Sequence, residues 1–185
     1  RIIRKGNSPA NYTWEVTDKQ GIKYVYGGEG AVLKGTITDV GGNSREIISE
    51  WKLKRVEETH GDYIEYVYET ADEPVRGGLV AKAISLKEVR AGNSGQAPHT
   101  VVVLEGSKQK RLKNNNARYG FLTSSNRLLE TLTVNFQGSK LRSYAFTYGE
   151  GAFFKDVLTG VRQLDDAGTE VSYQNFGYYD DVQAD

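Results

Sequence analysis

The sequence contains no cysteine and no methionine, and only two of its 185 residues are histidine. Without cysteine, disulfides, thiolate chemistry and Cys-ligated zinc are excluded. Lys plus Arg and Asp plus Glu both number 24, so no net charge attracts nucleic acid or anionic lipid. No apolar run approaches the ~18 residues needed to span a bilayer. We therefore expect neither nucleic-acid binding nor membrane insertion by this segment.

Proline is also scarce, with three residues, whereas glycine and aromatic residues are frequent: 21 Gly, 12 Tyr, 6 Phe and 2 Trp. Aromatic residues favour strands, and glycine favours the tight turns between them. A hydrophobic content of 38% is enough for a core but low for a thick one. We therefore expect a single β-rich module over residues 1–185. Because the sequence begins at Arg1 without Met, we expect a fragment of a much larger protein.

One unit recurs along the chain: a strand that opens on Trp or an aliphatic pair, a glycine turn, and a strand that closes on Tyr-x-Tyr. Residues 14–26, 51–68 and 132–148 are its copies, and their apolar residues alternate as on one face of a strand. The turn glycine can take the positive φ that tight hairpins need. Each copy is predicted to be a hairpin with one aromatic face. The recurring structural residues are Trp14, Gly21, Tyr24, Tyr26, Trp51, Gly61, Tyr66, Tyr68, Gly138, Tyr144 and Tyr148.

Further strands are expected at residues 83–89 with 100–104, and at 158–164 with 171–173. Helical patterns are weak. Val157, Val161 and Leu164 have the spacing of an apolar helix stripe, but Thr159 and Gly160 interrupt it, so residues 157–164 are better interpreted as a strand. The predicted fold class is all-β: successive antiparallel hairpins that form a curved or open sheet, with little or no helix. A partial β-propeller is the alternative, since Gly21 and Gly61 stand one blade length apart.

Residues that could support catalysis are few. His60 lies in a turn and His99 follows Pro98 in a polar loop, so both are expected to be exposed loop residues rather than general bases. A hydrolase on a β scaffold would need two facing carboxylates about 5 to 9 Å apart. The chain is expected not to be an enzyme. The weak candidates for such a pair are Glu150, Asp156, Asp165 and Asp166.

Metal and cofactor motifs are equally weak, and no cofactor is expected. The segment from Asp39 to Glu46, and Asp165-Asp166 with Glu170, offer oxygen ligands but lack calcium-loop spacing. Binding of calcium there would be adventitious. Gly28-Glu-Gly30 and Gly149-Glu-Gly151 lack the third glycine and the helix of a dinucleotide site. The basic stretch 108–113 lacks the interleaved aromatic residues of a single-strand nucleic-acid platform, which favours a solvated loop.

The Trp and Tyr faces have two interpretations. Flat rings on one strand face can stack on sugars, which would make the chain a carbohydrate-binding module at a bacterial cell surface. The rings can instead be structural ladders within the sheet. Their recurrence in every unit favours the structural role, because a binding site is local and a repeat is not.

The ordered blocks resemble SpvB-type proteins and the B component of insecticidal toxin complexes, which are related to RHS (YD-repeat) proteins. The segment from Asn7 to Gly27 is similar to their Trp-x-Val-x-x-x-x-Gly-x-x-Tyr-x-Tyr-Gly block. The segment from Trp51 to Glu69 is similar to their Trp-x-Leu-x-Arg-Val block and its Tyr-x-Tyr ending. Later blocks at residues 128–134, 142–148 and 158–161 keep the order, and the likeness spans about residues 7 to 179. The family's Asp-x-x-Gly-Asn turn appears here as Glu58-Thr-His-Gly61-Asp62.

The resemblance implies a non-catalytic structural shell module of a secreted or surface toxin-like bacterial protein. In such proteins the β-rich region forms part of a casing around a payload domain located elsewhere. The ADP-ribosyltransferase activity of some members needs a Glu-x-Glu pair, and none occurs in this chain. The implied partners are other segments of the same parent polypeptide or toxin-complex subunits. We also expect self-association through exposed edge strands of the isolated chain.

Overall fold

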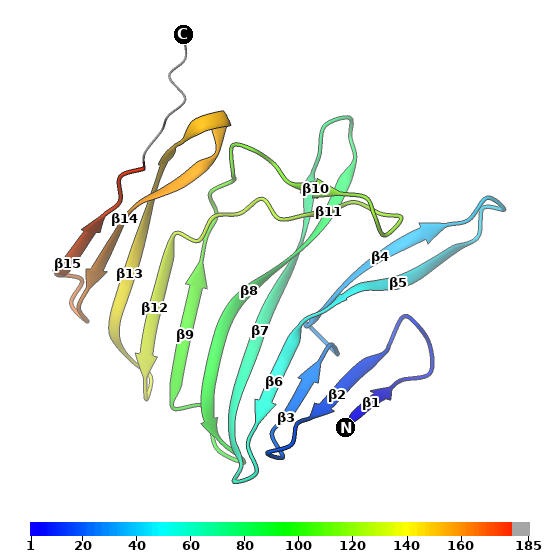
Figure 1. The fold of residues 1–185 in the computed structure, drawn as a ribbon, viewed down its shortest axis with the longest axis horizontal. Coiled ribbons are helices and arrows are strands. Elements are labelled where there is room, and N and C mark those ends of the chain that lie inside the picture. Colours follow the sequence, from blue (N-terminus) through cyan, green and yellow to red (C-terminus); the bar gives the residue numbers. More distant parts are fainter. Residues whose placement is uncertain (179–185) are drawn as a thin grey trace. The chain divides into compact units, whose positions relative to one another are not determined.

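The computed structural model describes residues 1–178, and nearly all of its regular structure is β-strand (Figure 1). The chain divides into two compact units. Unit 1 comprises Arg1–His99 and Asn115–Ser125, and unit 2 comprises Thr100–Asn114 and the residues from Asn126 onward. The only helical segment of the described chain is one short 3-10 turn, η1 (Ala152–Phe154). The predicted all-β class is confirmed, while the single-module expectation stays a prediction.

The main ladder of unit 1 is antiparallel throughout, and hairpin neighbours in sequence pair in space. Its order is β1 (Ile2–Lys5), β2 (Thr13–Thr17), β3 (Lys23–Tyr26), β6 (Leu53–Glu57), β7 (Asp62–Pro74) and β8 (Val80–Asn93). A separate two-stranded sheet, β4 (Val32–Thr38) and β5 (Ser44–Trp51), is inserted in sequence between β3 and β6. The short strand β11 (Thr123–Ser124) runs parallel to β8 and pairs with β10 (Asn115–Asn116).

Unit 2 is an antiparallel ladder whose last strands follow one another along the chain (Figure 1). Its order is β9 (Thr100–Glu105), β12 (Thr131–Phe136), β13 (Ser139–Glu150), β14 (Asp156–Leu164) and β15 (Glu170–Asn175). Each ladder is open and continuous rather than divided into separate blades. The open-sheet prediction is therefore confirmed over the partial β-propeller.

The registers confirm the three repeated hairpins. Trp14 faces Tyr26 across β2 and β3, and Val56 faces Ile64 across β6 and β7. In unit 2, β12 and β13 pair about the Gly138 turn. One detail differs: Trp51 ends β5, where it pairs with Val32, instead of opening β6. The strands predicted at 83–89, 100–104, 158–164 and 171–173 lie within β8, β9, β14 and β15, with β8 paired to β7 and β9 paired to β12.

Four hairpin turns share one backbone geometry. The residue that opens the turn donates its N–H to the carbonyl four residues later, with N···O distances of 2.9 to 3.1 Å. A glycine at the fourth position has φ between +82° and +93°, which only glycine adopts without strain. Three of the turns open on Asp, whose Oδ1 also accepts the N–H of the fifth residue, and one opens on Glu. The opening residues are Asp18, Asp39, Glu58 and Asp165.

Replacing Glu58 with Asp is expected to stabilise the protein. Glu58 is one methylene longer than the Asp residues at the same position, and it makes no bond to the N–H of Asp62. Glu58→Asp should supply that bond and raise the free energy of unfolding by about 0.5–1 kcal/mol. Urea unfolding measures the change. Asp18→Glu is the matched reverse exchange and should lower stability; an unchanged midpoint in both variants would contradict this account of the turn.

The buried apolar residues gather in unit 1, where β4 contacts β8. The ring of Phe121 lies flat against Gly35 of β4, which leaves no room for a Cβ at that position. In unit 2, Leu128 is the only buried hydrophobic residue among those described. Most of the ladder is thus a single layer without a dense core of its own. The buried hydrophobic residues of the described chain are Ala31, Val32, Leu33, Ile48, Ala81, Ala83 and Leu128.

Candidate functional site

The ladder of unit 1 has two faces of opposite character, because directly paired residues project to the same side. One face carries ion pairs that link neighbouring strands. Lys5 of β1 pairs with Glu15 of β2 at 2.8 Å, and Lys23 of β3 with Glu57 of β6 at 3.5 Å. Farther along, Arg90 of β8 reaches Glu65 of β7 at 3.8 Å. We call this the charged face: Lys5, Glu15, Lys23, Arg55, Glu57, Glu65, Glu88 and Arg90.

The other face of the same strands is apolar and aromatic. Val16, Tyr24, Val56 and Ile64 pair in turn across β2, β3, β6 and β7. None of these residues is buried: Ile64 is exposed and the others are half-buried, and Trp51 of β5 lies against Trp14. We call this the apolar face of unit 1: Trp14, Val16, Tyr24, Tyr26, Val56, Ile64, Tyr66 and Val89.

Unit 2 shows the same alternation. Leu104, Leu132 and Tyr144 face one another across β9, β12 and β13, and Phe146 pairs with Val161 of β14. The opposite side carries polar contacts such as Thr131 Oγ1 to Glu105, at 2.9 Å. The apolar face of unit 2 comprises Val102, Leu104, Leu132, Val134, Tyr144, Phe146 and Val161, and it also carries Arg142 opposite Val134 and Gln163 opposite Tyr144.

The last tyrosine of a hairpin donates to a backbone carbonyl at or near the start of that hairpin. Tyr68 donates its hydroxyl proton to the carbonyl of Leu53 at 2.8 Å, and Tyr148 donates to the carbonyl of Leu129 at 2.7 Å. Tyr178 makes the same bond to Leu158 at 2.8 Å, after β15. Burial raises the pKa of Tyr68 and of Tyr148, so both stay protonated donors at neutral pH. These tyrosines therefore have a structural role in the ladder.

In the first hairpin a tryptophan, rather than a tyrosine, donates a hydrogen bond to the carbonyl near the start of the hairpin. Trp51 donates its indole Nε1–H to the carbonyl of Tyr12 at 2.6 Å. Its ring meets Trp14 edge to face, with centroids 6.2 Å apart and an interplanar angle of 84°. Gly27 has φ +81°, and a Cβ there would lie 2.6 Å from Trp51 Cδ1. The two Trp residues that the sequence singles out therefore contact each other, which the spacing did not predict.

Removing the tyrosine hydroxyls tests these ties. Tyr68→Phe and Tyr148→Phe should each lower the free energy of unfolding by about 1 kcal/mol, because a partly buried carbonyl loses its donor. Thermal unfolding followed by circular dichroism measures the loss. Tyr66→Phe is the matched control, since Tyr66 shares the strand and face of Tyr68 but has no such bond among the described residues. Equal effects at Tyr66 and Tyr68 would contradict the role assigned to the hydroxyl.

His60, His99, Asp165 and Asp166, which were weighed for catalysis, lie in turns and loops. His60 and His99 are exposed, and His60 contacts the hydroxyl of the adjacent Thr59 at 3.3 Å. His99 lines a shallow pocket with Glu58 and Asp62. Asp165 and Asp166 accept backbone N–H groups within their own turn. Among residues 1–178, no group of three or more His, Asp or Glu side chains could hold a metal ion.

Glu150 and Asp156 do lie together, but both carboxylates form ion pairs with Arg111. Asp156, whose side chain is 4% exposed, accepts the backbone N–H and the Nη1–H of Arg111, both at 2.7 Å. Glu150 lies 3.4 Å from Nε of the same guanidinium, and Gly149 O accepts from Nη1 at 3.0 Å. The arrangement fastens the 106–114 segment to the ends of β13 and β14. This pair therefore serves as an anchor for that segment.

Glu130 anchors the start of the same segment. Its Oε2 accepts the N–H of Ser107, the hydroxyl of Ser107 and the N–H of Lys108, at 2.7, 2.9 and 3.0 Å. These bonds hold the pKa of Glu130 below its ordinary value of 4.5. The carboxylate thus contributes stability above pH 4.5 that is lost as the pH falls through the lower folded pKa.

The pH dependence of the melting temperature should therefore differ between the unmodified chain and the Glu130→Gln variant. At pH 7 the melting temperature of Glu130→Gln should lie below that of the unmodified chain. Between pH 4.5 and pH 3 the gap should shrink, because protonation removes the advantage of the carboxylate. Melting curves over this pH range measure it, and a gap independent of pH would contradict the assignment.

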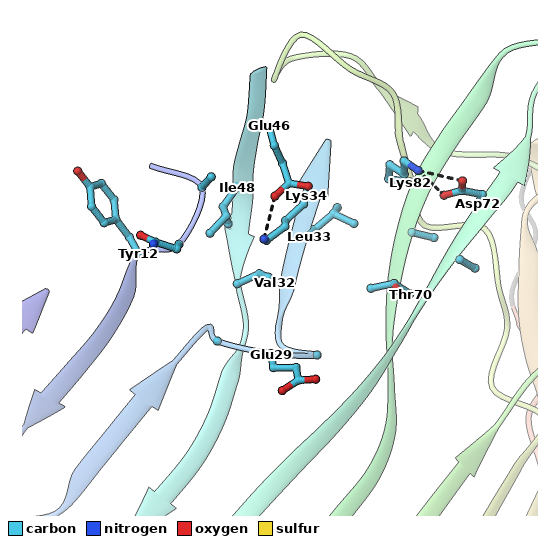
Figure 2. A pocket seen from close by; sticks show the side chains of 16 residues that line it. Tyr12, Glu29, Val32, Leu33, Lys34, Glu46, Ile48, Thr70, Asp72 and Lys82 are labelled. Carbon is cyan, nitrogen blue, oxygen red and sulfur yellow. Dashed lines mark hydrogen bonds and ion pairs between the residues drawn. The ribbon is translucent and has the colours of Figure 1, made fainter. Parts of the chain in front are cut away.

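A cleft of about 620 Å³ lies in unit 1, lined by residues of β4, β5, β7 and β8 and by the bends at residues 10–12 and 28–30. Figure 2 shows Lys34 paired with Glu46 on one wall and Lys82 paired with Asp72 on the other, at 2.9 and 2.7 Å. Glu29 lies between them at the base of the view. Gly28 and Gly30 have positive φ and form the bend between β3 and β4. The cleft is thus bordered by paired charges.

Asp39, weighed as a calcium ligand, is used by its own turn. Its Oδ1 accepts the N–H groups of Gly41 and Asn43, both at 2.9 Å. These bonds lower the pKa of Asp39. The turn joins β4 to β5, a hairpin that the sequence reasoning did not identify although it has the same Asp-x-x-Gly pattern as the Asp18 turn.

Solved structures show what this architecture is similar to. The N-terminal domain of effector protein SpvB from Salmonella typhimurium strain LT2 superposes with a TM-score of 0.68 and 16% identity, over 89% of this chain. The chain has the fold of that SpvB domain. It spans 65% of the SpvB chain, slightly less than two thirds of its length. The resemblance stated from the sequence is thereby confirmed at the level of the fold.

Two Tc toxin structures share the fold as well. The TcdB2-TccC3-TEV structure matches with a TM-score of 0.61 and 14% identity over 89% of this chain. The Photorhabdus luminescens Tc holotoxin pore, with mutation TccC3-D651A, matches with a TM-score of 0.61 and 15% identity over 89% of this chain. The chain spans 10% of each of those chains. No protein-family model matches the sequence, and no curated protein sequence matches it significantly. No helix among the described residues is long and apolar enough to cross a membrane.

Proposed function

We propose that this chain is a non-catalytic wall module of a larger toxin-like bacterial protein of the Tc or RHS type. Its sheet would form part of a casing that encloses or delivers a payload domain located elsewhere. The partners would be other segments of the same polypeptide or subunits of a toxin complex. The protein would be secreted or displayed at the cell surface. The shared fold with SpvB and Tc toxin components supports this proposal.

The observation that carries the proposal is the opposition of the two faces. A wall needs one surface that tolerates water and one that packs against another layer. The charged face of unit 1 carries linked ion pairs, while the apolar face leaves Val16 and Tyr24 half-buried and Ile64 exposed. An uncovered apolar face of this extent is typical of an interaction surface. Other parts of the parent protein would supply the cover.

The principal alternative is a carbohydrate-binding module. Its ring platform would have to include Trp14 or Tyr66. Trp14 is engaged edge to face with Trp51, and the last tyrosines of the hairpins donate to backbone carbonyls. These contacts support the structural interpretation. Binding on a glycan array that is lost in Trp14→Ala or Tyr66→Ala would favour the carbohydrate module instead.

Sedimentation of the purified chain tests the wall proposal. The isolated chain should associate with rising concentration, through its uncovered apolar faces and the free edges of β1 and β15. Val134→Lys places a charge on the apolar face of unit 2 and should reduce the association. Thr133→Lys, one residue away and on the opposite face of β12, is the matched control and should not. A chain that stays monomeric at all concentrations would contradict the proposal.

A further inference from the structure

The turn between β13 and β14 has an unusual backbone. Phe153 and Phe154 of η1 are consecutive bulky residues with φ of +57° and +59°. Non-glycine residues of this size are rarely found in that region, and such strain is concentrated at functional positions. Both side chains project into solvent, with 72% and 70% of their surface exposed. The fold thus holds two apolar rings outward at a loop tip, at a cost in backbone energy.

The base of the tip is rigid. Gly151 donates its N–H to the carbonyl of Lys155 at 2.8 Å, which closes the loop. Immediately below, Arg111 joins Asp156, Glu150 and the carbonyl of Gly149, as described above. The rings are therefore presented by a fixed scaffold.

Arg111 also brings a third exposed apolar residue and an exposed lysine to this place. Leu112, which is 56% exposed, follows Arg111 directly, and Lys113 follows Leu112. On the other side of the tip, Lys155 is exposed next to Phe154. Arg111 pairs with both nearby carboxylates, Glu150 and Asp156, and offsets one of their two negative charges, so that the two lysines leave the tip with a small positive excess. Figure 1 shows η1 and the segment after β9 at the same end of unit 2.

We propose that this tip, formed by Leu112, Phe153 and Phe154 and flanked by Lys113 and Lys155, docks on the surface of an anionic lipid bilayer. The rings would enter the boundary between headgroups and acyl chains, and the lysines would contact lipid phosphates. The whole chain has no net charge, so the attraction is local to the tip. This would be contact with the interface rather than spanning of the membrane, and it departs from the expectation, drawn from net charge and the lack of a long apolar run, that this segment does not insert into membranes.

The size of the tip favours a bilayer over a protein partner. A buried aromatic side chain covers about 150–250 Å², so two rings and one leucine fall well short of the roughly 800 Å² per partner in a stable protein interface. Insertion of a convex tip into a bilayer requires no matching pocket. Docking would be independent of the proposed wall function, which uses the apolar faces of the sheet.

Co-sedimentation of the full chain with vesicles tests the proposal. One set of vesicles contains phosphatidylcholine alone, and the other contains equal parts of phosphatidylcholine and phosphatidylglycerol. The chain should bind the anionic vesicles about tenfold more strongly, and added salt should weaken the binding. Phe153→Gly with Phe154→Gly should reduce binding at least about tenfold. Because glycine accepts positive φ, this double variant should melt no lower than the unmodified chain.

Val40→Ser is the control, since Val40 is a fully exposed apolar residue at another hairpin tip. Its binding should match that of the unmodified chain, while Lys113→Glu with Lys155→Glu should remove the preference for anionic vesicles. The proposal is overturned if the unmodified chain does not sediment with anionic vesicles, or if the double glycine variant binds equally well. If the double variant instead loses self-association without any vesicle binding, the tip is a protein contact.

Discussion

Trp51→Ala is expected to lower the free energy of unfolding by about 3 kcal/mol, the low end for a large aromatic residue because Trp51 is half-buried. The substitution removes the edge-to-face contact with Trp14 and the bond from Nε1 to the carbonyl of Tyr12. It also leaves a void over Gly27, whose α-carbon lies directly against the indole. Urea unfolding of unit 1, followed by the fluorescence of the remaining Trp14, measures the loss.

Trp51→Phe separates the two contributions. Phenylalanine keeps a ring against Trp14 but cannot donate to Tyr12, so the loss should be about 1–2 kcal/mol. Trp14→Ala gives the converse case, in which the bond to Tyr12 is kept. The account of Trp51 as the link between β2 and β5 would fail if Trp51→Phe were as stable as the unmodified chain.

Gly106→Ala is expected to have the largest effect of any alanine substitution at a glycine in unit 2. A Cβ at this position would collide with the backbone carbonyl of Leu128, which a side-chain rotation cannot relieve. The chain must then shift at the point where Glu130 holds Ser107 and Lys108. We expect a loss of about 3 kcal/mol, as for severe overpacking. Differential scanning calorimetry measures it.

Gly177→Ala is the control for Gly106→Ala. It lies in the same unit, it has no positive φ, and no atom of residues 1–178 outside its chain neighbours lies within 4 Å of the Cβ it would acquire. Its melting temperature should stay within a degree or so of that of the unmodified chain, since it touches nothing. Similar losses in the two variants would show that the contact with Leu128 is not the cause.

The hairpins were predictable because their determinants are local. Alternation in residues 14–26 and the glycine at position 21 specify two strands and the turn between them without reference to the rest of the chain. The same holds for β12 with β13 and for β14 with β15. The sheet therefore follows from short-range pattern, which is also why the resemblance to the SpvB-type blocks could be drawn from the sequence.

The β4–β5 sheet was missed for a different reason. Its turn at Asp39 was weighed as an oxygen-ligand site, although it repeats the Asp-x-x-Gly spacing of the Asp18 turn. Gly35 interrupts the strand pattern before this turn. A glycine is needed there because the ring of Phe121, from a distant segment, leaves no room for a Cβ. For the same reason Trp51 was assigned to the start of β6. Its pairing with Val32 depends on the inserted sheet.

The charged face and the tyrosine ties lay beyond sequence reasoning because they depend on register between strands. Lys23 and Glu57 are far apart in sequence, and they meet only because β3 pairs with β6 rather than with β4. The acceptors of Tyr68 and Tyr148 are backbone carbonyls, which leave no mark in the sequence. The exposed rings of Phe153 and Phe154 likewise depend on a backbone conformation that no local propensity predicts.

Thiol labelling of single cysteine variants tests the central claim most directly, and within residues 1–185 the introduced thiol is the only one. Val134→Cys and Thr133→Cys place a thiol on opposite faces of β12 in adjacent positions. In the larger protein to which we propose this chain belongs, we predict that the thiol at 134 is protected at least tenfold relative to the isolated chain, while the thiol at 133 reacts equally fast in both. Equal labelling rates at the two positions in the parent protein would contradict the account of a sheet covered on one face.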